Sequence, residues 1–288
     1  MPELPEVETI RMQLARFLIG QKITSIDVFN PKSTGHNKNI GKMLIGNKIT
    51  KIDRIGKLLI ISINENSKHF LLIHLKMTGQ LLYVNESGKL HAGGHTISNS
   101  DTSSLPGRHT RIAIAFEDNS TLYFNDMRLF GYMKIADKYE TEQIKTRFGP
   151  EPIDPDFDVK EFIQRLKRKT AMIKPILLDQ TFVAGLGNIY VDEALWRSGI
   201  RPTRRGNKIS KSEAVKLIKS ANEVLSESIK MGGTTFRDFV DSAGNKGNYY
   251  EKLLVFGKND IPCVRCGTLI KKIKVAGRGT HYCPSCQS

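Results

Sequence analysis

Four cysteines near the end of the chain have the spacing of a metal site. They form two C-x2-C pairs separated by sixteen residues, and they are the only cysteines of the sequence: Cys263, Cys266, Cys283 and Cys286. Two such pairs can place four thiolates around one tetrahedral zinc ion. Two disulfides are the alternative, but MPELPEVE at the start lacks the apolar core of a secretion signal, and disulfides are rare in the reducing cytosol. We therefore expect one structural Zn2+ per chain, which folds a module and leaves no open position for chemistry.

The second residue, Pro2, is a candidate nucleophile. A small residue after Met1 normally allows the methionine to be removed, and this would expose a secondary amine. Such an amine has a pKa near ~8, so roughly a tenth of it is uncharged at neutral pH. Amines form Schiff bases with carbonyl-type carbons, and the adjacent Glu3 can act as acid or base. Alone, a proline at this position carries little meaning.

A glycine-rich turn between two helical segments is a candidate anion site. Glycines in Ala184–Asn188 (AGLGN) let backbone N–H groups converge beside a helix N-terminus, where Asn188 adds a side-chain donor. The chain has 44 Lys and Arg against 29 Asp and Glu, a formal net charge of +15, which attracts polyanions. Nucleic acid is the favoured partner, although solubility or a lysine-rich proteome would also account for the charge.

Hydrophobic periodicity predicts the elements that position these residues. Apolar residues recur at three- and four-residue steps from Val7 to Leu18, as in an amphipathic helix. Turn-rich stretches separate short β-type runs, a pattern typical of an antiparallel sandwich. These runs are Ile23–Phe29, Ile49–Ile55, Leu58–Ile63, Phe70–Leu75, Leu81–Val84, Arg111–Phe116 and Thr121–Phe124. The longest apolar stretches are far shorter than the ~20 residues of a membrane-spanning helix.

The remaining chain divides into a loop, a helical block and a basic end. Asn85–Arg108 is polar and small, so we expect a mobile loop there. Gly149–Pro155 is rich in proline and is the best domain boundary. Val159–Met231 has helical periodicity in four pieces, and the segment that follows ends in short strands that carry the cysteines.

Separated motifs make the whole chain resemble the bacterial formamidopyrimidine-DNA glycosylases. These are MPELPEVET at the start, RIGKLLI from Arg54, HLKMTG from His74, DMRLFG from Asp126, LLDQTFVAGLGNIYVDEALWRSGI from Leu177, GGTT from Gly232 and GRGTHYCPSCQ from Gly277. The family's start motif, PELPE, differs from the PEGPE of the related endonuclease VIII branch. The resemblance implies a bifunctional glycosylase and AP lyase that removes 8-oxoguanine and ring-opened purines from duplex DNA in base excision repair.

The resemblance also assigns catalytic roles to matching positions. Pro2, once Met1 is removed, would attack C1′ of the damaged nucleotide and form the Schiff base, with Glu3 as general acid–base partner. Glu6 would support the same pocket. Lys57 would contact phosphate beside the lesion and assist elimination, and Arg278 would clamp phosphate and assist the second elimination.

Further matching positions are expected to bind DNA. His74, His109, Arg128 and Lys169 would touch the DNA backbone or the opposite strand, and Asn188 the phosphates beside the lesion. Because a glycosylase must swing its base out of the stack, something must fill the hole. Met77, Arg128 and Phe130 would form a wedge that fills it, and Arg128 would donate hydrogen bonds to the opposite cytosine, which has lost its paired base.

The implied fold is α+β and multidomain. Residues 2–137 would form the catalytic antiparallel β-sandwich with flanking helices, 138–231 a linker and the helix–two-turn–helix domain, and 232–288 a lesion-capping loop and the zinc β-hairpin. Duplex DNA with a damaged base would lie in a basic cleft between them. We expect a monomer of the bacterial cytoplasm that is associated with the nucleoid through DNA and makes no membrane contact.

One departure from the family pattern lies before the cysteines. Where the family commonly has VYGR, this chain has Val255-Phe256-Gly257-Lys258, so a hydroxyl and a planar guanidinium are missing. The departure leaves the chemistry intact but bears on lesion preference. Two alternatives stay open from the sequence: an endonuclease VIII-like glycosylase for oxidised pyrimidines, and a non-catalytic zinc-containing protein that binds damaged DNA.

Overall fold

The computed structural model of the chain describes residues 2–65, 68–95, 105–234, 239–240 and 248–288. It divides into two compact units. The first unit comprises Met1–Thr146 and Met231–Asn248, and the second comprises Arg147–Lys230 and Tyr249–Ser288. The functional division into three domains at residues 137 and 231 stays a prediction. Within the described ranges, no helix combines the length and apolarity that a membrane crossing requires.

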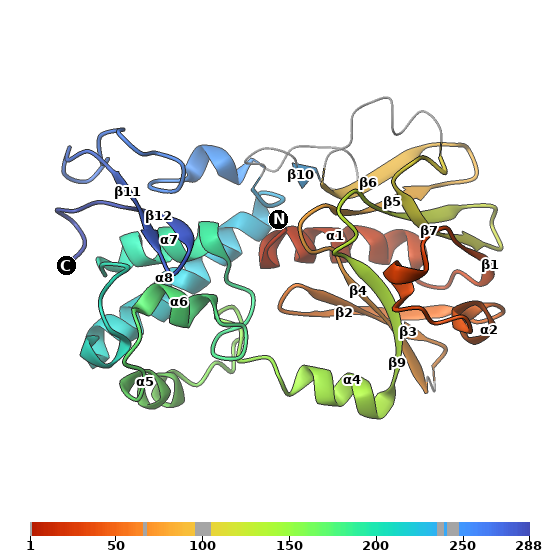
Figure 1. Ribbon diagram of the computed structural model, residues 1–288, viewed down its shortest axis with the longest axis horizontal. Helices are drawn as coiled ribbons and strands as arrows, with labels where there is room; N and C mark the ends of the chain where they lie inside the picture. The colour runs from red at the N-terminus through yellow and green to blue at the C-terminus, as the bar shows by residue number, and fades with distance from the viewer. Residues whose placement is uncertain (1, 66–67, 96–104, 235–238, 241–247) are drawn as a thin grey trace. The chain divides into compact units, whose positions relative to one another are not determined.

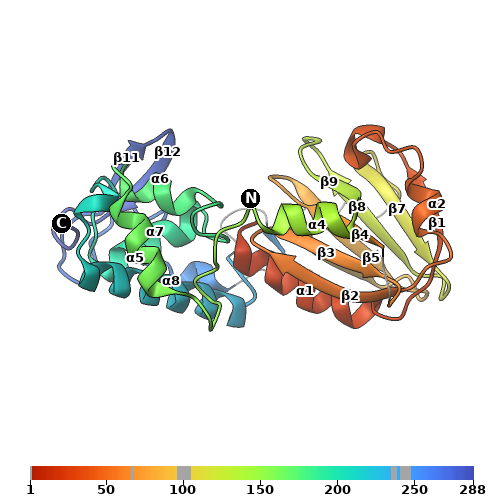
Figure 2. The same cartoon turned by 90° about the horizontal axis from the view of Figure 1, so that it is seen from below.

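In the first unit, the described residues form two antiparallel sheets that share one hydrophobic core (Figures 1 and 2). The larger sheet has the strand order β1-β7-β8-β5-β6-β10, and the smaller has the order β2-β3-β4-β9. Their strands are β1 (Ile23–Val28), β2 (Ile49–Ile55), β3 (Leu58–Ile63), β4 (His69–His74), β5 (Gly79–Val84), β6 (Leu90–His95), β7 (Thr110–Phe116), β8 (Thr121–Asp126), β9 (Tyr132–Asp137) and β10 (Phe239–Val240). The predicted antiparallel sandwich is therefore confirmed.

Helix α1 (Leu4–Leu18) packs one apolar face into this core. Burying a side chain of this size contributes roughly 1.5–3 kcal/mol, so the helix is held firmly against the sheets. The buried face consists of Val7, Ile10, Leu14 and Leu18. Pro2 and Glu3 directly precede the helix, and its packing fixes their place. The shorter helical segments of the unit are η1 (Pro31–Thr34), α2 (Ile40–Leu44) and α4 (Lys138–Lys145).

The prediction of a loop over Asn85–Arg108 is wrong for its first part. Leu90–His95 forms β6 and pairs with β5 in the register Val84↔Leu90 to Gln80↔Gly94. The segment has few β-branched residues, and its pairing comes from the neighbouring strand, which a short Asn85–Lys89 turn brings alongside. Residues 96–104 lie outside the described residues.

The second unit consists of helices and one β-hairpin in the described residues. The four helical pieces predicted between Val159 and Met231 are confirmed as α5 (Val159–Lys167), α6 (Ile173–Leu178), α7 (Asn188–Ser198) and α8 (Lys211–Lys230). Short 3-10 segments are η2 (Gly206–Lys208) and η3 (Tyr249–Lys252), and the hairpin is β11 (Lys271–Val275) with β12 (Arg278–Tyr282). Helix α7 lies beside both α8 and β12 (Figure 1), so it connects the helices to the hairpin.

Candidate functional site

The start of the chain brings a candidate nucleophile beside two buried carboxyl groups. Pro2 is buried, and Glu3 and Glu6 are 4% and 2% exposed. The backbone N–H of Glu3 donates to the Glu6 carboxylate at 2.8 Å. The other oxygen of Glu6 accepts from the backbone N–H of Thr234 at 2.7 Å. Glu6 therefore joins the first turn of α1 to the segment at Thr234, a contact between residues far apart in sequence.

The segment after Thr234 was expected to be a lesion-capping lid. Its ends are held together, because Thr234 forms a β-bridge with Asn248 and the Asn248 N–H donates to the Met231 carbonyl. Residues 235–238 and 241–247 of this segment lie outside the described residues. The carboxylate of Glu6 thus anchors the first described end of the segment to the N-terminal helix.

Lys57 lies in the two-residue turn between β2 and β3. It is 7% exposed, which is unusual for a lysine. The turn is held by Arg54, which donates to the Gly56 carbonyl at 2.8 Å and to the Glu8 carboxylate of α1 at 2.9 Å. Gly56 has φ +55°, a left-handed conformation that glycine adopts at little cost. The sequence predicts no role for Arg54, whereas the structure shows that it fixes the turn that carries Lys57.

His74, at the end of β4, is held neutral. Burial, together with the positive charges of Lys76 and Lys57, lowers the pKa of His74 to about 3. Its Nδ1 accepts a hydrogen bond from the Lys76 backbone N–H at 3.0 Å, so the proton of the neutral ring is on Nε2. A neutral imidazole with Nε2–H is a donor that suits a phosphate oxygen.

The depressed pKa of His74 predicts a specific loss of stability in acid. The unfolded chain binds a proton on this ring below pH 6.5, and the folded chain does so only near pH 3. Stability from this group is therefore present above pH 6.5 and is lost as the pH falls toward 3. His74→Asn cannot titrate there. We expect the difference in unfolding free energy between wild type and variant, measured by urea denaturation, to shrink as the pH falls through this window. A pH-independent difference would contradict the assignment.

Three predicted wedge residues lie together on two neighbouring loops. Met77 follows β4, and Arg128 and Phe130 follow β8. The Arg128 guanidinium donates to the Met77 sulfur at 3.4 Å and lies 4.7 Å from the centre of the Phe130 ring. Apolar side chains such as Met77 and Phe130 ordinarily pack in the hydrophobic core. Here they are 41% and 48% exposed, so they are not core residues. The cluster presents two apolar groups and one cation to solvent.

Asp126 organises both loops, a role that was not predicted from the sequence. It is fully buried, and its carboxylate accepts from the Thr78 hydroxyl on one loop. It also accepts from the backbone N–H groups of Arg128 at 3.2 Å and Gly131 at 2.7 Å on the other. The Asp126 N–H donates to the His109 carbonyl, which places His109 beside the same loops. An aspartate at the end of a strand and five residues before a glycine is the signal that could have indicated this turn.

In the second unit, Asn188 begins α7 and contacts the hairpin. Its side-chain Nδ2 donates to the Gly279 carbonyl at 3.0 Å. The preceding turn contains Gly185 at φ +91°, and Gln180 spans it by accepting from the Gly185 N–H and donating to the Leu186 carbonyl. The predicted helix–glycine turn–helix is confirmed, and the amide donor of Asn188 is directed at the hairpin.

Arg278 lies at the tip of the hairpin and is exposed. Ala276 and Gly277 form the two-residue turn, with φ of +46° and +79°. Two positive φ values are those of a type I′ turn, whose twist matches that of the flanking strands. Arg278 pairs with Val275 as the last pair of the ladder, so it is the first residue of β12 after the turn.

Lys169 lies on a separate basic patch of the second unit. It is exposed, and its ammonium is 5.6 Å from the centre of the Phe182 ring, which Arg165 also covers at 4.8 Å. A shallow cavity of about 300 Å³ is lined by Arg165, Arg168, Lys169, Thr181 and Phe182. Two cations over one aromatic ring, with Arg168 beside them in the cavity lining, form an anion-attracting surface.

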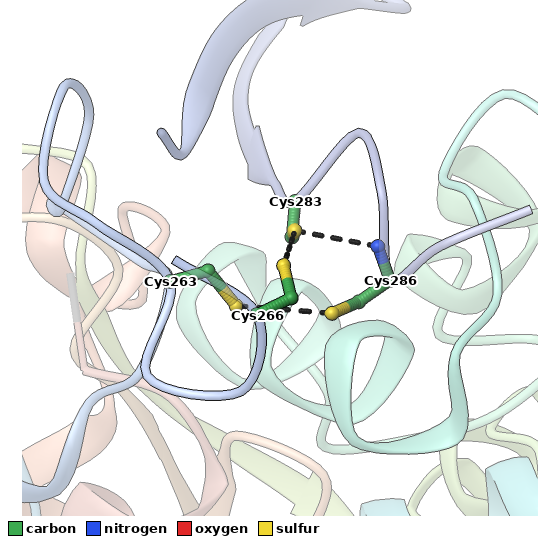
Figure 3. A group of neighbouring side chains, drawn as sticks. All are labelled: Cys263, Cys266, Cys283 and Cys286. Atoms are coloured by element: carbon green, nitrogen blue, oxygen red, sulfur yellow. Dashed lines mark hydrogen bonds between the residues drawn. The ribbon is translucent and has the colours of Figure 1, made fainter. Parts of the chain in front are cut away.

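The four cysteines converge as a tetrahedral metal site requires (Figure 3). All four sulfur atoms lie within 4.8 Å of one another, with 3.9 Å between Cys263 and Cys286 and 3.5 Å between Cys266 and Cys283. Zinc–sulfur bonds of about 2.3 Å need sulfur atoms roughly 3.8 Å apart around a tetrahedron. The residues therefore fit zinc. Cys263 and Cys283 are buried against Trp196 of α7, which joins the module to the helices.

The departure at Phe256 and Lys258 is visible in the same unit. The Phe256 ring meets the His281 ring edge-on at 5.0 Å, and the Lys258 ammonium lies 5.5 Å from the centre of the Tyr250 ring. The buried carboxylate of Glu193 accepts the backbone N–H groups of Leu254, Val255 and Phe256 at 2.8–3.1 Å. Burial raises the pKa of Glu193, while these three hydrogen bonds oppose that shift.

The structure thus places the predicted residues in two groups. The first unit carries Pro2, Glu3, Glu6, Lys57, His74, Met77, His109, Arg128 and Phe130, and the second carries Lys169, Asn188, Arg278 and the four cysteines. Within the first unit, Glu3 lies with Glu6, and Arg128 with Met77 and Phe130. Within the second, Asn188 lies against the hairpin that carries Arg278.

A β-sandwich behind an N-terminal helix, a helix–glycine turn–helix and a four-cysteine hairpin define the class of helix–two-turn–helix proteins with a zinc finger. Family comparison agrees segment by segment. Residues 1–133 match the formamidopyrimidine-DNA glycosylase N-terminal domain, residues 148–240 the H2TH domain of the same enzymes, and residues 260–288 the zinc finger found in FPG and IleRS.

Whole-chain relatives agree with the domain matches. The formamidopyrimidine-DNA glycosylase of Listeria monocytogenes is 40% identical over 293 residues, covering 100% of both chains, and that of Pelotomaculum thermopropionicum is 40% identical, covering 100% of this chain and 99% of its own. Lactococcus lactis Fpg in complex with abasic-site DNA is similar in structure, with a TM-score of 0.87 and 38% identity, covering 100% of both chains. A Lactococcus lactis FPG mutant with Fapy-dG DNA gives 0.88 and 38%, again covering 100% of both chains. The chain belongs to the formamidopyrimidine-DNA glycosylase family.

Proposed function

We propose that the protein is a bifunctional DNA glycosylase and AP lyase that excises oxidised purines, among them 8-oxoguanine and formamidopyrimidines, from duplex DNA in base excision repair. The observation that carries the proposal is the position of Pro2, buried directly before the carboxyl groups of Glu3 and Glu6 at the start of α1. Solved structures that are similar to this chain are complexes with DNA that contains Fapy-dG, carbocyclic 8-oxo-G or an abasic site. These complexes support the choice of lesion class.

Pro2 acts as the nucleophile once Met1 has been removed. Its secondary amine attacks C1′ of the damaged nucleotide, the base leaves, and a Schiff base joins the protein to the sugar. Glu3 exchanges the protons of these steps, because it is adjacent to the amine and shielded from water. Glu6 holds the first turn of α1 in place through its bonds to Glu3 and Thr234.

The Schiff base then permits two eliminations. Withdrawal of electrons by the iminium makes the C2′ protons acidic, and β-elimination breaks the bond between C3′ and its oxygen. δ-elimination follows at C5′ and leaves a one-nucleotide gap with phosphate at both ends. Lys57 assists the first step and binds the phosphate beside the lesion, and Arg278 assists the second and clamps phosphate.

Duplex DNA is bound through phosphate contacts and a wedge. His74, His109, Lys169 and Asn188 contact the backbone, and the neutral His74 does so as a hydrogen-bond donor. Base extrusion costs a few kcal/mol, which the wedge offsets by replacing lost stacking. Met77 and Phe130 stack in the gap, and the guanidinium of Arg128 bonds to the opposite cytosine. This assignment is supported by the exposure and mutual contact of the three side chains.

One structural zinc ion is held by Cys263, Cys266, Cys283 and Cys286. The ion supplies folding free energy to the hairpin module, and its four thiolate ligands leave no position for substrate. Residues 2–137 form the catalytic domain, 138–231 the linker and helix–two-turn–helix domain, and 232–288 the capping loop and zinc finger. The protein acts as a monomer on DNA of the nucleoid in the bacterial cytoplasm.

The proposal is tested by borohydride trapping. The protein is incubated with a duplex that carries 8-oxoguanine opposite cytosine, and borohydride reduces any imine to a stable adduct. We expect a covalent protein–DNA complex with this duplex and with an abasic-site duplex, and a weaker one with dihydrothymine. Trapping with dihydrothymine in preference to 8-oxoguanine would instead indicate a pyrimidine-directed enzyme. No adduct on either 8-oxoguanine or abasic DNA, with Met1 removed and zinc bound, would leave only a binding protein.

A further inference from the structure

A fully buried ion pair lies under the hairpin that carries Arg278. Lys174 of α6 and Asp192 of α7 are both 0% exposed, and the Lys174 ammonium donates to one oxygen of Asp192 at 2.6 Å. Taking two charges out of water has a large cost, and apolar side chains of similar size often give equal or greater stability. A gain in stability therefore does not distinguish this pair from apolar side chains. Its hydrogen bonds do, because they are directional and apolar contacts are not.

Both members of the pair also bind the hairpin backbone. The Lys174 ammonium donates to the Gly279 carbonyl at 3.2 Å, and the second oxygen of Asp192 accepts from the backbone N–H of His281 at 2.8 Å. Gly279 directly follows Arg278, and His281 lies two residues further along β12. The pair thus holds strand β12 at two points, Gly279 and His281. Asn188 also contacts the first of these, Gly279.

We infer that Lys174 and Asp192 are positioning residues for Arg278, acting through the backbone of β12. A two-stranded hairpin is only marginally ordered by itself, so its direction depends on what holds it. The tip of this hairpin is a two-residue turn, and the exposed Arg278 is the first residue after it. Holding the carbonyl of the next residue limits the movement of the arginine relative to α7. This inference rests on the proposed role of Arg278 in the second elimination.

The test uses the double variant Lys174→Met/Asp192→Leu in the full-length zinc-bound protein. It removes both contacts to the hairpin and leaves no unpaired buried charge, so the unit can still fold. An abasic-site duplex is the substrate, which separates the eliminations from base excision. We expect the ratio of δ- to β-elimination product to fall about tenfold, since misplacement of a reacting group by about 1 Å can cost more than that. Borohydride trapping should change less than twofold.

Two comparisons separate positioning from general stability. Glu227→Gln weakens an ion pair that joins α8 to Arg197 of α7 rather than to the hairpin, so it should lower the melting temperature without changing the product ratio. In an Arg278→Ala background, the double variant should have less than a twofold further effect. A ratio that stays at the wild-type value in the double variant, while Arg278→Ala lowers it, would overturn the inference. If Arg278→Ala itself leaves the ratio unchanged, the role of Arg278 is wrong and the inference falls with it.

Should the double variant fail to fold, Asp192→Asn is a second, milder test, which leaves one of the two hairpin contacts in place. The amide retains an oxygen that can accept from His281 but loses the charge that holds the Lys174 ammonium. A smaller fall in the product ratio, in the same direction, supports the inference. An unchanged ratio in a protein with full zinc content would overturn it.

Discussion

Capping Pro2 with one preceding residue that the cell does not remove is expected to lower strand cleavage at 8-oxoguanine by about a thousandfold or more. The cap turns the secondary amine into an amide, which has no nucleophilic lone pair, and any new terminal amine is displaced by about 3.8 Å. Loss of a catalytic nucleophile typically removes most of an enzyme's rate enhancement. Borohydride trapping should disappear with it, because trapping requires the same imine.

The matched controls lie in the same turn of the protein. Pro5→Ala changes the other proline at the start of α1 and leaves the terminal amine in place, so cleavage should remain within about threefold of wild type. Pro2→Gly retains an amine but loses the ring, and we expect an intermediate loss of about a hundredfold, since glycine samples many more backbone conformations. Single-turnover cleavage of a labelled duplex measures all three. Wild-type cleavage by the capped protein would rule out Pro2 as nucleophile.

Much of the fold could be predicted because its signals are local. The apolar steps from Val7 to Leu18 and the short β-type runs between turn-rich stretches are properties of short windows, and both are confirmed. Strand β6 was missed because LHAGGH is a poor β sequence and is ordered by its partner β5. Strand β9 was missed because YMKIAD contains a lysine and an aspartate and has no continuous apolar run, and pairing with β4 determines its place.

The residues of the site likewise divide into those with a local signal in the sequence and those without one. The cysteines have a fixed spacing and one metal-binding geometry, so four residues within a span of 24 could be predicted to meet, and they do. Asp126, in contrast, acts by joining Thr78 to Arg128, residues that are fifty positions apart in the chain. The same holds for Lys174 and Asp192 beneath the hairpin. A buried polar residue that joins two loops leaves no periodic signal in the sequence.

Removing the metal is expected to unfold the hairpin module and to be seen directly in the fluorescence of Trp196. This is the only tryptophan of the chain, it is 5% exposed, and it packs against Cys263 and Cys283. Zinc binding to such modules supplies roughly 10–16 kcal/mol of folding free energy at neutral pH, far more than the small apolar cluster here can replace. On chelation, Trp196 emission should shift to longer wavelength and become accessible to iodide.

Loss of one ligand should reproduce the effect of chelation. In Cys283→Ala the remaining three thiolates bind zinc more weakly, and a cavity is left beside Trp196. We expect zinc content to fall from one ion per chain, red-shifted emission, and affinity for lesion DNA lowered about a hundredfold or more, since the module carrying Arg278 is then disordered. Ser285→Ala, an exposed change between the last two cysteines, should leave all three unchanged. A Cys283→Ala protein with full zinc and unshifted Trp196 emission would show that the cysteines pack the module without a metal. Trp196 emission reports on the zinc module, whereas borohydride trapping of Pro2 on abasic-site DNA reports on the first unit. The two measurements together show whether loss of zinc disorders the module alone.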